Sequence, residues 1–375
     1  MKRIALSFFV LLWVPLYAVS APTAEQLERA AEEIQSLIEK GMLVGAQLAV
    51  GHEERILLNR NFGVRSIEDD SPVDSETMFC IGSCSKPISS AVVMTLVDDE
   101  KIELDRGIDH WLPAFGDLKT SEGEATRAPT MAELLSHHGG VYSQKMGMTR
   151  KQSRWIRDFR LTLEESVDAI AKEPLYTLPG AEYAYSGAGY CVLGRVAEVA
   201  ADKSFEQLLQ DRLCEPLGLE HTSYFPSSEN ENVASGSMNE KINRTTPHLW
   251  EPFKLPLIGG SLYSTSTDSA KFLQTVWQQA TSREDILMSN EQFKAYTTPF
   301  SKKQRYAFGW SQMMANGKPF GIAHSGSLAS SRALFQINLE KGVYLALLYT
   351  VSGSGGANEV RQEINDVVRP LTGKR

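Results

Sequence analysis

The stretch MFCIGSCSKPISSAVV, residues 78–93, decides how the rest of the chain is interpreted. It places Ser83 three residues before Lys86, at the start of an apolar pattern with helical spacing. Residues three apart are neighbours on a helix surface, so we expect the hydroxyl and the amine on one face of the first turn. A lysine amine there can help to remove the serine proton and make the oxygen a nucleophile. Ser83 is therefore a candidate nucleophile and Lys86 a candidate base.

Both residues also have an ordinary structural explanation. Serine is a favoured N-cap residue, so Ser83 could do no more than begin the helix. Lys86 fits that explanation less well, because a cation near the positive end of a helix is mildly unfavourable. A short motif of this kind also arises by chance, so on its own it does not establish an enzyme.

The composition predicts a globular protein that carries a leader. The chain has 375 residues, of which 42% are hydrophobic and 22% charged, enough for one large or two intimately joined domains. Lys2 and Arg3 precede an apolar run and then small residues, which predicts a signal peptide over residues 1–20. A retained membrane anchor is the alternative, but the run is shorter than the roughly 20 residues that span a bilayer. We expect an exported protein, periplasmic or extracellular, without stable membrane insertion after cleavage.

Charge and side-chain chemistry argue against several classes of function. The formal net charge is −8, and −10 without the leader, which makes a nucleic-acid partner a poor expectation. The adjacent His137 and His138 belong to no His-Glu-x-x-His helix, so neither a metal nor an organic cofactor is implied. The four cysteines allow one or two disulfides in three full pairings, although buried free thiols are favoured. These cysteines are Cys80, Cys84, Cys191 and Cys214.

Periodicity predicts an α+β fold. Residues 23–40 have the stripe of an amphipathic helix and open with a capping-box pattern, and residues 45–65 look like two strands. Residues 333–339 and 343–349 flank a turn as in a hairpin, and residues 358–368 are helical in pattern. We expect an antiparallel sheet built from both ends of the chain, with the terminal helices on one face.

The middle of the chain is predicted to be a mostly helical insertion beside that sheet. A cleft between the sheet and the insertion is a natural place for a site. After the leader we expect one catalytic domain, residues 21–375. Its α/β part covers about 21–78 and 255–375, and its helical part covers about 79–254.

Two further motifs give the Ser-x-x-Lys pair its context. LPGAEYAYSGAGYCVLGRVAE, residues 178–198, places Tyr185 before a helix, and IAHSGSLASSRALF, residues 322–335, carries His324 before an apolar segment. With them the chain resembles the serine β-lactamase and penicillin-binding-protein superfamily. Within it the likeness is to class C β-lactamases and the related D-aminopeptidases, D-Ala-D-Ala carboxypeptidases and esterases. Further motifs follow the expected order: FCIGSCSKPISSAVVMTLVDDEKIELD, MAELLSHHGG, EPLGLEHTSY, GGSLYSTSTDSAKF and YAFGWS.

The resemblance implies a role for each residue of the pair and for Tyr185. Ser83 matches the acylated nucleophile, and Lys86 matches the lysine that shares proton transfer with it. The pKa of Lys86 would have to fall from about 10.4 for a neutral amine to be common near neutral pH. Tyr185 matches a general acid/base partner, although a buried core tyrosine is its ordinary explanation.

The resemblance also implies where substrate is held. His324, Ser325 and Gly326 match the family's Lys-Thr-Gly element in its His-x-Gly form and would bind substrate, although His324 could instead be a structural histidine. The backbone amides of Ser83 and Ser327 match the oxyanion hole. One such donor contributes roughly 3 kcal/mol to catalysis.

One substrate-binding position departs from the family pattern. Gly187 stands where the family's Tyr-x-Asn element has asparagine, whose amide contacts the acyl-amide group of substrates. Glycine offers no side-chain donor or acceptor, so acylation stays plausible while amide recognition is in doubt. Glycine also widens the cleft at that point for bulkier or less polar acyl groups.

We therefore expect a serine hydrolase that forms an acyl-enzyme at Ser83. Its substrates would be small esters, D-amino-acid peptides or related amides, with peptidoglycan-derived peptides among them. Two alternatives stay open. One is a β-lactam hydrolase or D-Ala-D-Ala carboxypeptidase, and the other is a catalytically silent relative that binds cell-wall peptide or a protein.

Overall fold

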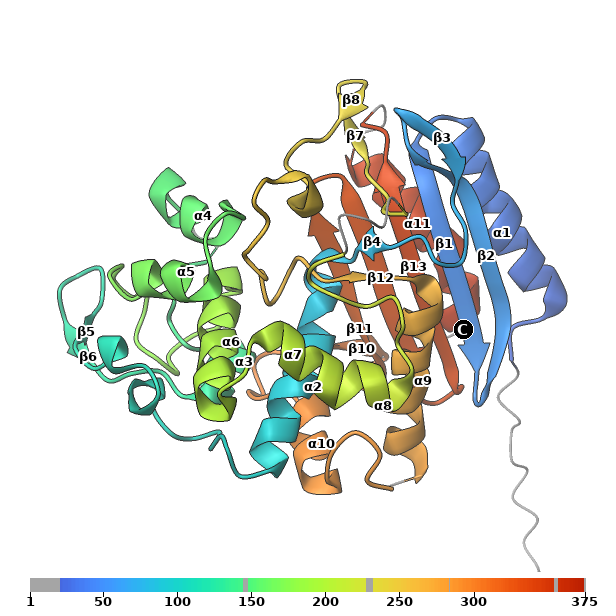
Figure 1. Cartoon of the computed structure of the whole chain (residues 1–375). Helices are drawn as coiled ribbons and strands as arrows, with labels where there is room; N and C mark the ends of the chain where they lie inside the picture. Colours follow the sequence, from blue (N-terminus) through green and yellow to red (C-terminus); the bar gives the residue numbers. More distant parts are fainter. Residues whose placement is uncertain (1–20, 144–147, 227–231, 283, 354–356, 374–375) are drawn as a thin grey trace, which may run out of the picture.

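A seven-stranded antiparallel sheet forms the framework of the molecule (Figure 1). The computed structural model describes residues 21–143, 148–226, 232–282, 284–353 and 357–373, so the expected leader lies outside the described residues. The strand order is β10-β11-β12-β13-β1-β2-β3. The strands are β1 (Leu43–His52), β2 (Arg55–Ser66), β3 (Asp69–Pro72), β10 (Ser311–Ala315), β11 (Lys318–Leu328), β12 (Ser331–Asn338) and β13 (Val343–Val351).

Both ends of the chain build this sheet, as the sequence predicts. Strand β1 lies between β2 and β13, and Leu48 pairs with Leu347 across the β1–β13 ladder. Helices α1 (Ala24–Glu39) and α11 (Ala357–Thr372) pack together over one face of the sheet, where they bury an apolar layer. Helix α1 opens with the predicted capping box, because the Thr23 hydroxyl and the Gln26 side chain each accept the other's backbone N–H.

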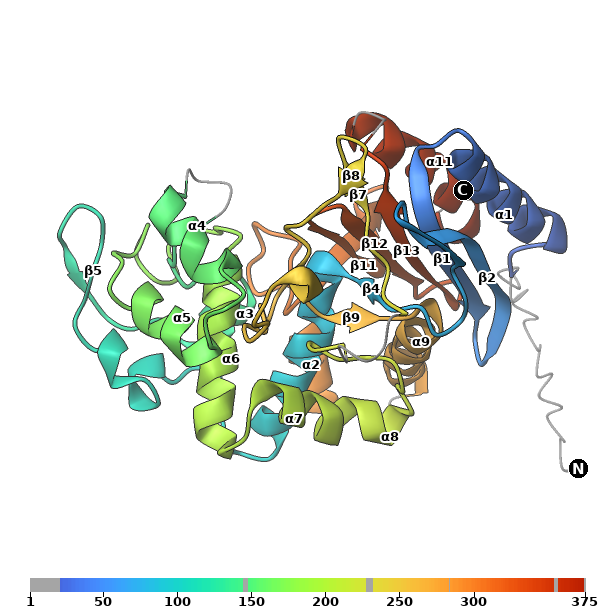
Figure 2. The ribbon, with the colours of Figure 1, turned by 45° about the horizontal axis from the view of Figure 1, so that its top comes forward.

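Helix α2 (Ser85–Asp98) lies in the middle of the molecule, between the sheet and the helical region (Figures 1 and 2). Its residues from Ser85 to Leu96 are all buried. A helix that is surrounded by protein needs no polar face, which explains why its apolar pattern is continuous rather than one-sided. The nucleophile motif therefore stands at the start of a central, rigid helix.

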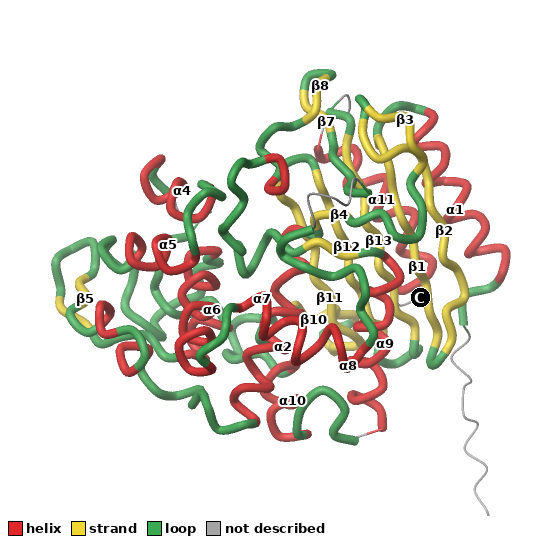
Figure 3. The backbone as a smooth tube through the Cα atoms, in the orientation of Figure 1, coloured by secondary structure: helices red, strands yellow, loops and turns green. Residues whose placement is uncertain are grey.

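The helical region gathers on the side of α2 away from β1 and β2, and Figure 3 shows it as helices joined by long loops. Its boundaries near residues 78 and 254 stay a prediction. The remaining helices are α3 (Met131–Leu135), α4 (Arg150–Arg157), α5 (Leu163–Ile170), α6 (Gly187–Ala201), α7 (Phe205–Leu209), α8 (Glu215–Leu217), α9 (Ser266–Ser282) and α10 (Asn290–Thr297). Short two-stranded ladders join β4 (Phe79–Cys80) to β9 (Tyr263–Ser264), β5 (Leu118–Lys119) to β6 (Ala125–Thr126), and β7 (Ser237–Met238) to β8 (Lys241–Ile242).

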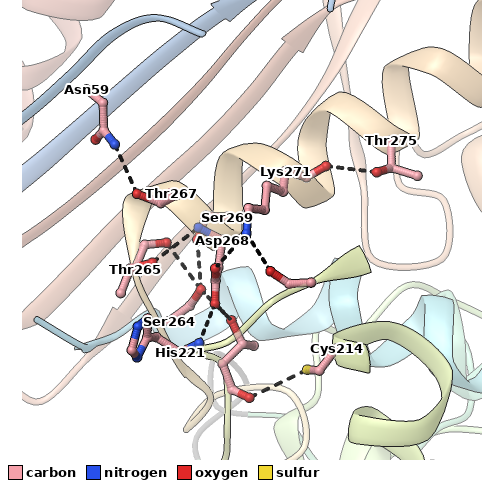
Figure 4. Close-up of polar contacts among 12 residues, drawn as sticks. Asn59, Cys214, His221, Ser264, Thr265, Thr267, Asp268, Ser269, Lys271 and Thr275 are labelled. Carbon is pink, nitrogen blue, oxygen red and sulfur yellow. Dashed lines mark hydrogen bonds and ion pairs between the residues drawn. The ribbon is translucent and has the colours of Figure 1, made fainter. Parts of the chain in front are cut away.

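A buried carboxylate ties the helical region to α9 (Figure 4). Asp268, in the first turn of α9, accepts hydrogen bonds from the His221 backbone N–H at 2.7 Å and the Thr222 hydroxyl at 3.0 Å. A carboxylate near a helix N-terminus also faces the positive end of the helix dipole. Asp268 therefore fixes the segment that carries His221 and Thr222 against α9, which packs on the sheet.

The four cysteines are buried free thiols, as the sequence analysis favours. Burial raises the pKa of the Cys80 and Cys191 thiols to about 12, so both stay protonated at neutral pH. Within the described part of the chain, every helix is too short or too polar to span a membrane.

Candidate active site

Ser83 lies in a single 3-10 turn, Gly82–Cys84, directly before α2. The residue that precedes α2 is Cys84, whose side chain makes no capping hydrogen bond. Ser83 is half-buried, and its hydroxyl oxygen lies 3.3 Å from the Lys86 Nζ. The alternative that Ser83 is only a helix cap is therefore wrong.

Lys86 is buried beside Ser83 with its amine held from two sides. Besides contacting the serine oxygen, Nζ donates a hydrogen bond to the Gly259 carbonyl at 2.6 Å. The rings of Tyr185 and Tyr190 lie 4.6 and 5.0 Å from Nζ. Only 2% of the Lys86 surface is exposed, and this burial lowers the pKa of the amine to about 7. Neutral lysine is therefore abundant near neutral pH, and a neutral amine can accept the serine proton.

Gly259 leaves the room that this amine occupies. A Cβ at residue 259 would lie 2.8 Å from the Lys86 Nζ and 3.0 Å from its Cε. Any larger residue would push the amine away from Ser83.

Tyr185 completes the proton-transfer group. Its hydroxyl and the Ser83 side chain are hydrogen-bonded. It lies in the irregular segment before α6, where its main-chain carbonyl accepts a hydrogen bond from the Ser143 hydroxyl at 2.6 Å. Burial raises the pKa of the phenol, so it carries its proton at neutral pH and can donate it.

Two glycines bring the expected oxyanion donors together. A Cβ on Gly82 would lie 2.3 Å from the Ser327 backbone nitrogen, and one on Gly326 would lie 1.9 Å from the Ile81 carbonyl oxygen. Gly82 also has a φ of +53°, in the left-handed region that favours glycine. Because both positions lack side chains, β11 contacts the turn that carries Ser83, and the Ser327 amide comes to lie beside it.

His324 lies at the site but is fully engaged by the protein. It is 7% exposed, its Nδ1 lies 2.9 Å from the Ser325 carbonyl oxygen, and its Nε2 lies 3.0 Å from the Tyr306 hydroxyl. A carbonyl only accepts, so we assign the proton to Nδ1, and Tyr306 donates to Nε2. Burial, and then the nearby Lys86, lower the pKa of His324 to about 3, so the imidazole is neutral.

The other expected substrate-binding residues lie around this centre. Ser325 and Ser327 are exposed on β11, and Gly326 faces the serine turn. Gly187 is the buried first residue of α6, directly after Ser186, whose hydroxyl caps that helix by accepting from the Gly189 N–H at 2.9 Å.

Sequence analysis missed three residues of the site. Gly259 holds the lysine amine, Tyr190 packs its ring against it, and Tyr306 fixes the His324 ring. Gly259 and Tyr306 open the motifs GGSLYSTSTDSAKF and YAFGWS, which mark family likeness without showing what these residues contact. The only available signal was the position of these two residues within ordered motifs.

Comparisons with known proteins agree with this geometry. A family model described as Beta-lactamase matches residues 30–369. Protein Rv1367c of Mycobacterium tuberculosis (strain H37Rv) is 27% identical over 327 residues, covering 80% of each chain. The solved structure of "EstCE1, a hydrolase with promiscuous acyltransferase activity" is similar with a TM-score of 0.77 at 21% identity, covering 92% of this chain and 98% of that one. D-amino acid amidase from Ochrobactrum anthropi SV3 is similar with a TM-score of 0.71 at 19% identity, covering 93% and 99%.

Proposed function

We propose that this chain, a serine hydrolase of the beta-lactamase family, forms an acyl-enzyme at Ser83. We also propose, from the leader pattern of residues 1–20, that it is exported. Its substrates are small esters, D-amino-acid peptides or related amides. One observation carries the assignment of the nucleophile: a buried lysine amine, with a pKa near neutrality, lies 3.3 Å from the Ser83 hydroxyl oxygen.

In the proposed first step, the Ser83 oxygen attacks the substrate carbonyl carbon while its proton passes to the neutral Lys86 amine. The carbonyl oxygen becomes negative and accepts hydrogen bonds from the amides of Ser83 and Ser327. When the bond to the leaving atom breaks, Tyr185 gives that atom a proton and is reprotonated from the Lys86 ammonium. The leaving group departs as an alcohol or amine, and Ser83 carries the acyl group.

In the second step the same groups act on water. Lys86, neutral again, accepts a proton from water, through Tyr185 or directly, and the resulting hydroxide attacks the acyl carbonyl. The Ser83 oxygen leaves and regains its proton, and the carboxylic acid is released. Each turnover consumes one water.

Gly187 and the relatives support a substrate range that includes both esters and amides, rather than a single narrow class. A glycine at the start of α6 offers no side-chain amide to recognise a peptide-like acyl group. The two solved structures named above carry descriptions of a hydrolase with acyltransferase activity and a D-amino acid amidase.

Carboxylate-bearing substrates, such as D-Ala-D-Ala peptides or β-lactams, are a second candidate class. Arg332 lies opposite Ser327 in the β11–β12 ladder. Burial is the main cause that lowers the pKa of Arg332, and the nearby charge of Arg361 lowers it further. Within the part of the chain that the structure describes, neither arginine forms an ion pair with a carboxylate. Arg332 donates to the Ala329 and Ser331 carbonyls and lies on the face of the sheet that α11 covers, so the two arginines place positive charge beside the serine site, at this end of β11.

A panel of short-chain esters, D-amino-acid amides and peptides, and a cephalosporin tests the proposal. Wild type and Ser36→Ala, whose serine is also half-buried but lies on α1, are expected to hydrolyse at least one class equally well. Ser83→Ala is expected to lower kcat by about 10⁴-fold or more. Undiminished turnover by Ser83→Ala would contradict the nucleophile assignment. No turnover of any class, together with no covalent adduct from a fluorophosphonate, would favour the silent binding relative.

A further inference from the structure

A continuous path of aromatic rings leads from Tyr185 to the surface. The ring of Tyr306 lies 6.2 Å from that of Tyr185, and the ring of Tyr183 lies 5.8 Å from that of Tyr306. His138 follows at 5.8 Å from Tyr183, and Phe300 at 5.0 Å from His138. These contacts begin at the phenol that is hydrogen-bonded to Ser83.

Backbone contacts hold the path in place. Tyr183 and Tyr185 lie in the irregular segment before α6, and the His137 ring contacts both of their rings, at 5.8 and 4.2 Å. The Ala184 N–H between them donates to the His137 carbonyl at 2.8 Å. The Phe300 N–H approaches the Tyr306 carbonyl at 3.4 Å, so the loop between these residues folds back on itself.

The outer end of the path is unusually apolar for a surface. Phe300 is 43% exposed, Leu178 38% and Tyr176 37%. Segment 176–180 lies against the His138 loop, because the Tyr176 N–H donates to the Gly140 carbonyl at 2.7 Å and the Gly180 N–H to the His138 carbonyl at 2.8 Å. Leu178 and Tyr176 thus belong to the segment beside His138, the residue whose ring contacts Phe300, and exposed apolar side chains of this kind are a common feature of ligand binding.

The direction of the path follows from the proposed chemistry. Tyr185 gives its proton to the leaving atom, so that atom must lie beside its hydroxyl. A substituent on the leaving atom that extends along the path reaches the partly exposed ring of Tyr183 and then Phe300, because Tyr306 and His138 are only 5% and 4% exposed. The acyl group, in contrast, is attached to the carbonyl that lies between the amides of Ser83 and Ser327.

We propose that the partly exposed ring of Tyr183 and the exposed ring of Phe300, backed by the buried rings of Tyr306 and His138, form a leaving-group subsite that binds an aromatic or branched apolar group. This inference rests on the proposed acylation at Ser83 and narrows it to alcohols or amines of that kind. Burial lowers the pKa of His138, which keeps the subsite uncharged at neutral pH and suits it to an uncharged ring.

Two acetate esters that differ only in the alcohol, benzyl acetate and ethyl acetate, test the subsite. Phe300→Ala is expected to lower kcat/KM for benzyl acetate by about five-fold, the value of one lost ring contact. The same variant should leave ethyl acetate nearly unchanged. Ile286→Ala is the matched control, because Ile286 is 40% exposed and belongs to no ring contact of the path. It should change neither ester.

The outcomes separate the subsite from the reaction itself. Equal effects of Phe300→Ala on both esters, or no effect on either, would overturn the subsite while leaving the hydrolase intact. A selective effect on ethyl phenylacetate rather than benzyl acetate would move the aromatic subsite to the acyl side and overturn its assignment to the leaving group. If wild type hydrolyses neither ester and no fluorophosphonate adduct forms, both the proposed function and the subsite fall.

Discussion

Burial of Lys86 makes the rate of acylation at Ser83 depend on pH in a defined way. A lysine with its ordinary pKa of 10.5 would be about 0.03% neutral at pH 7, whereas a pKa of about 7 makes it half neutral. Burial thus multiplies the supply of neutral amine by about 10³. At pH 5 the neutral fraction falls again, to about 1%.

The assay is the rate constant for inactivation by a fluorophosphonate between pH 5 and pH 9, which needs no knowledge of the natural substrate. We expect the rate constant to fall about ten-fold per pH unit below 7 and to level off above it. His324 does not titrate in this range, because burial lowers its pKa to about 3, so the inflection reports Lys86.

Lys86→Gln should remove both the inflection and most of the rate. Lys101→Gln, at an exposed position just past α2, should keep the wild-type profile. A wild-type profile that is flat from pH 5 to pH 9, or one that inflects near pH 10, would refute the account of a buried, neutral lysine.

Three further variants test the Lys86 site and the Asp268 junction. Because the pKa of Lys86 is lower in the folded state, the unfolded chain binds more protons between about pH 7 and 10.5. The free energy of unfolding therefore rises with pH through that window, as the buried amine loses its charge. Lys86→Met should therefore raise the free energy of unfolding at pH 6 by about 1–4 kcal/mol in urea titrations; a destabilised variant would contradict this. Gly259→Ala places a Cβ 2.8 Å from the Lys86 amine and should slow fluorophosphonate inactivation about 100-fold with an unchanged circular dichroism spectrum, so a wild-type rate would show that the amine tolerates displacement. Asp268→Ala leaves the His221 N–H without its acceptor and the Thr222 hydroxyl with Ser264 as its remaining partner, and should lower the free energy of unfolding by about 1–3 kcal/mol, whereas a loss below about 0.5 kcal/mol would mean that water replaces the carboxylate.

Local sequence patterns predicted the helices and strands that are determined by interactions between residues close in sequence. The capping box at Thr23 and Gln26 and the alternation in residues 333–349 report backbone preferences and burial within a few residues, and α1, β12 and β13 form as expected. Helix α9 was not predicted, because its buried residues include Ser269, Thr275 and Gln279, and their polar side chains obscure the apolar stripe.

The site was predictable in its residue types but not in its contacts. Ser83, Lys86, Tyr185 and Ser327 come together as the resemblance implies, since their motifs are distinctive in sequence. The carbonyl of Gly259, however, lies 173 positions from Lys86 along the chain, and no pattern in the sequence reports such a pairing. Burial by residues distant in sequence lowers the pKa of the lysine, and the Gly259 carbonyl orients its amine.

The most direct test is the mass of the protein after reaction with a fluorophosphonate, followed by fragmentation of the peptide that contains residues 78–86. A single adduct on Ser83, absent from Ser83→Ala and weakened in Lys86→Gln, is the predicted result. An adduct on Ser85 or on any other residue, or an unmodified wild-type protein, would contradict the claim that a buried neutral lysine makes Ser83 the nucleophile.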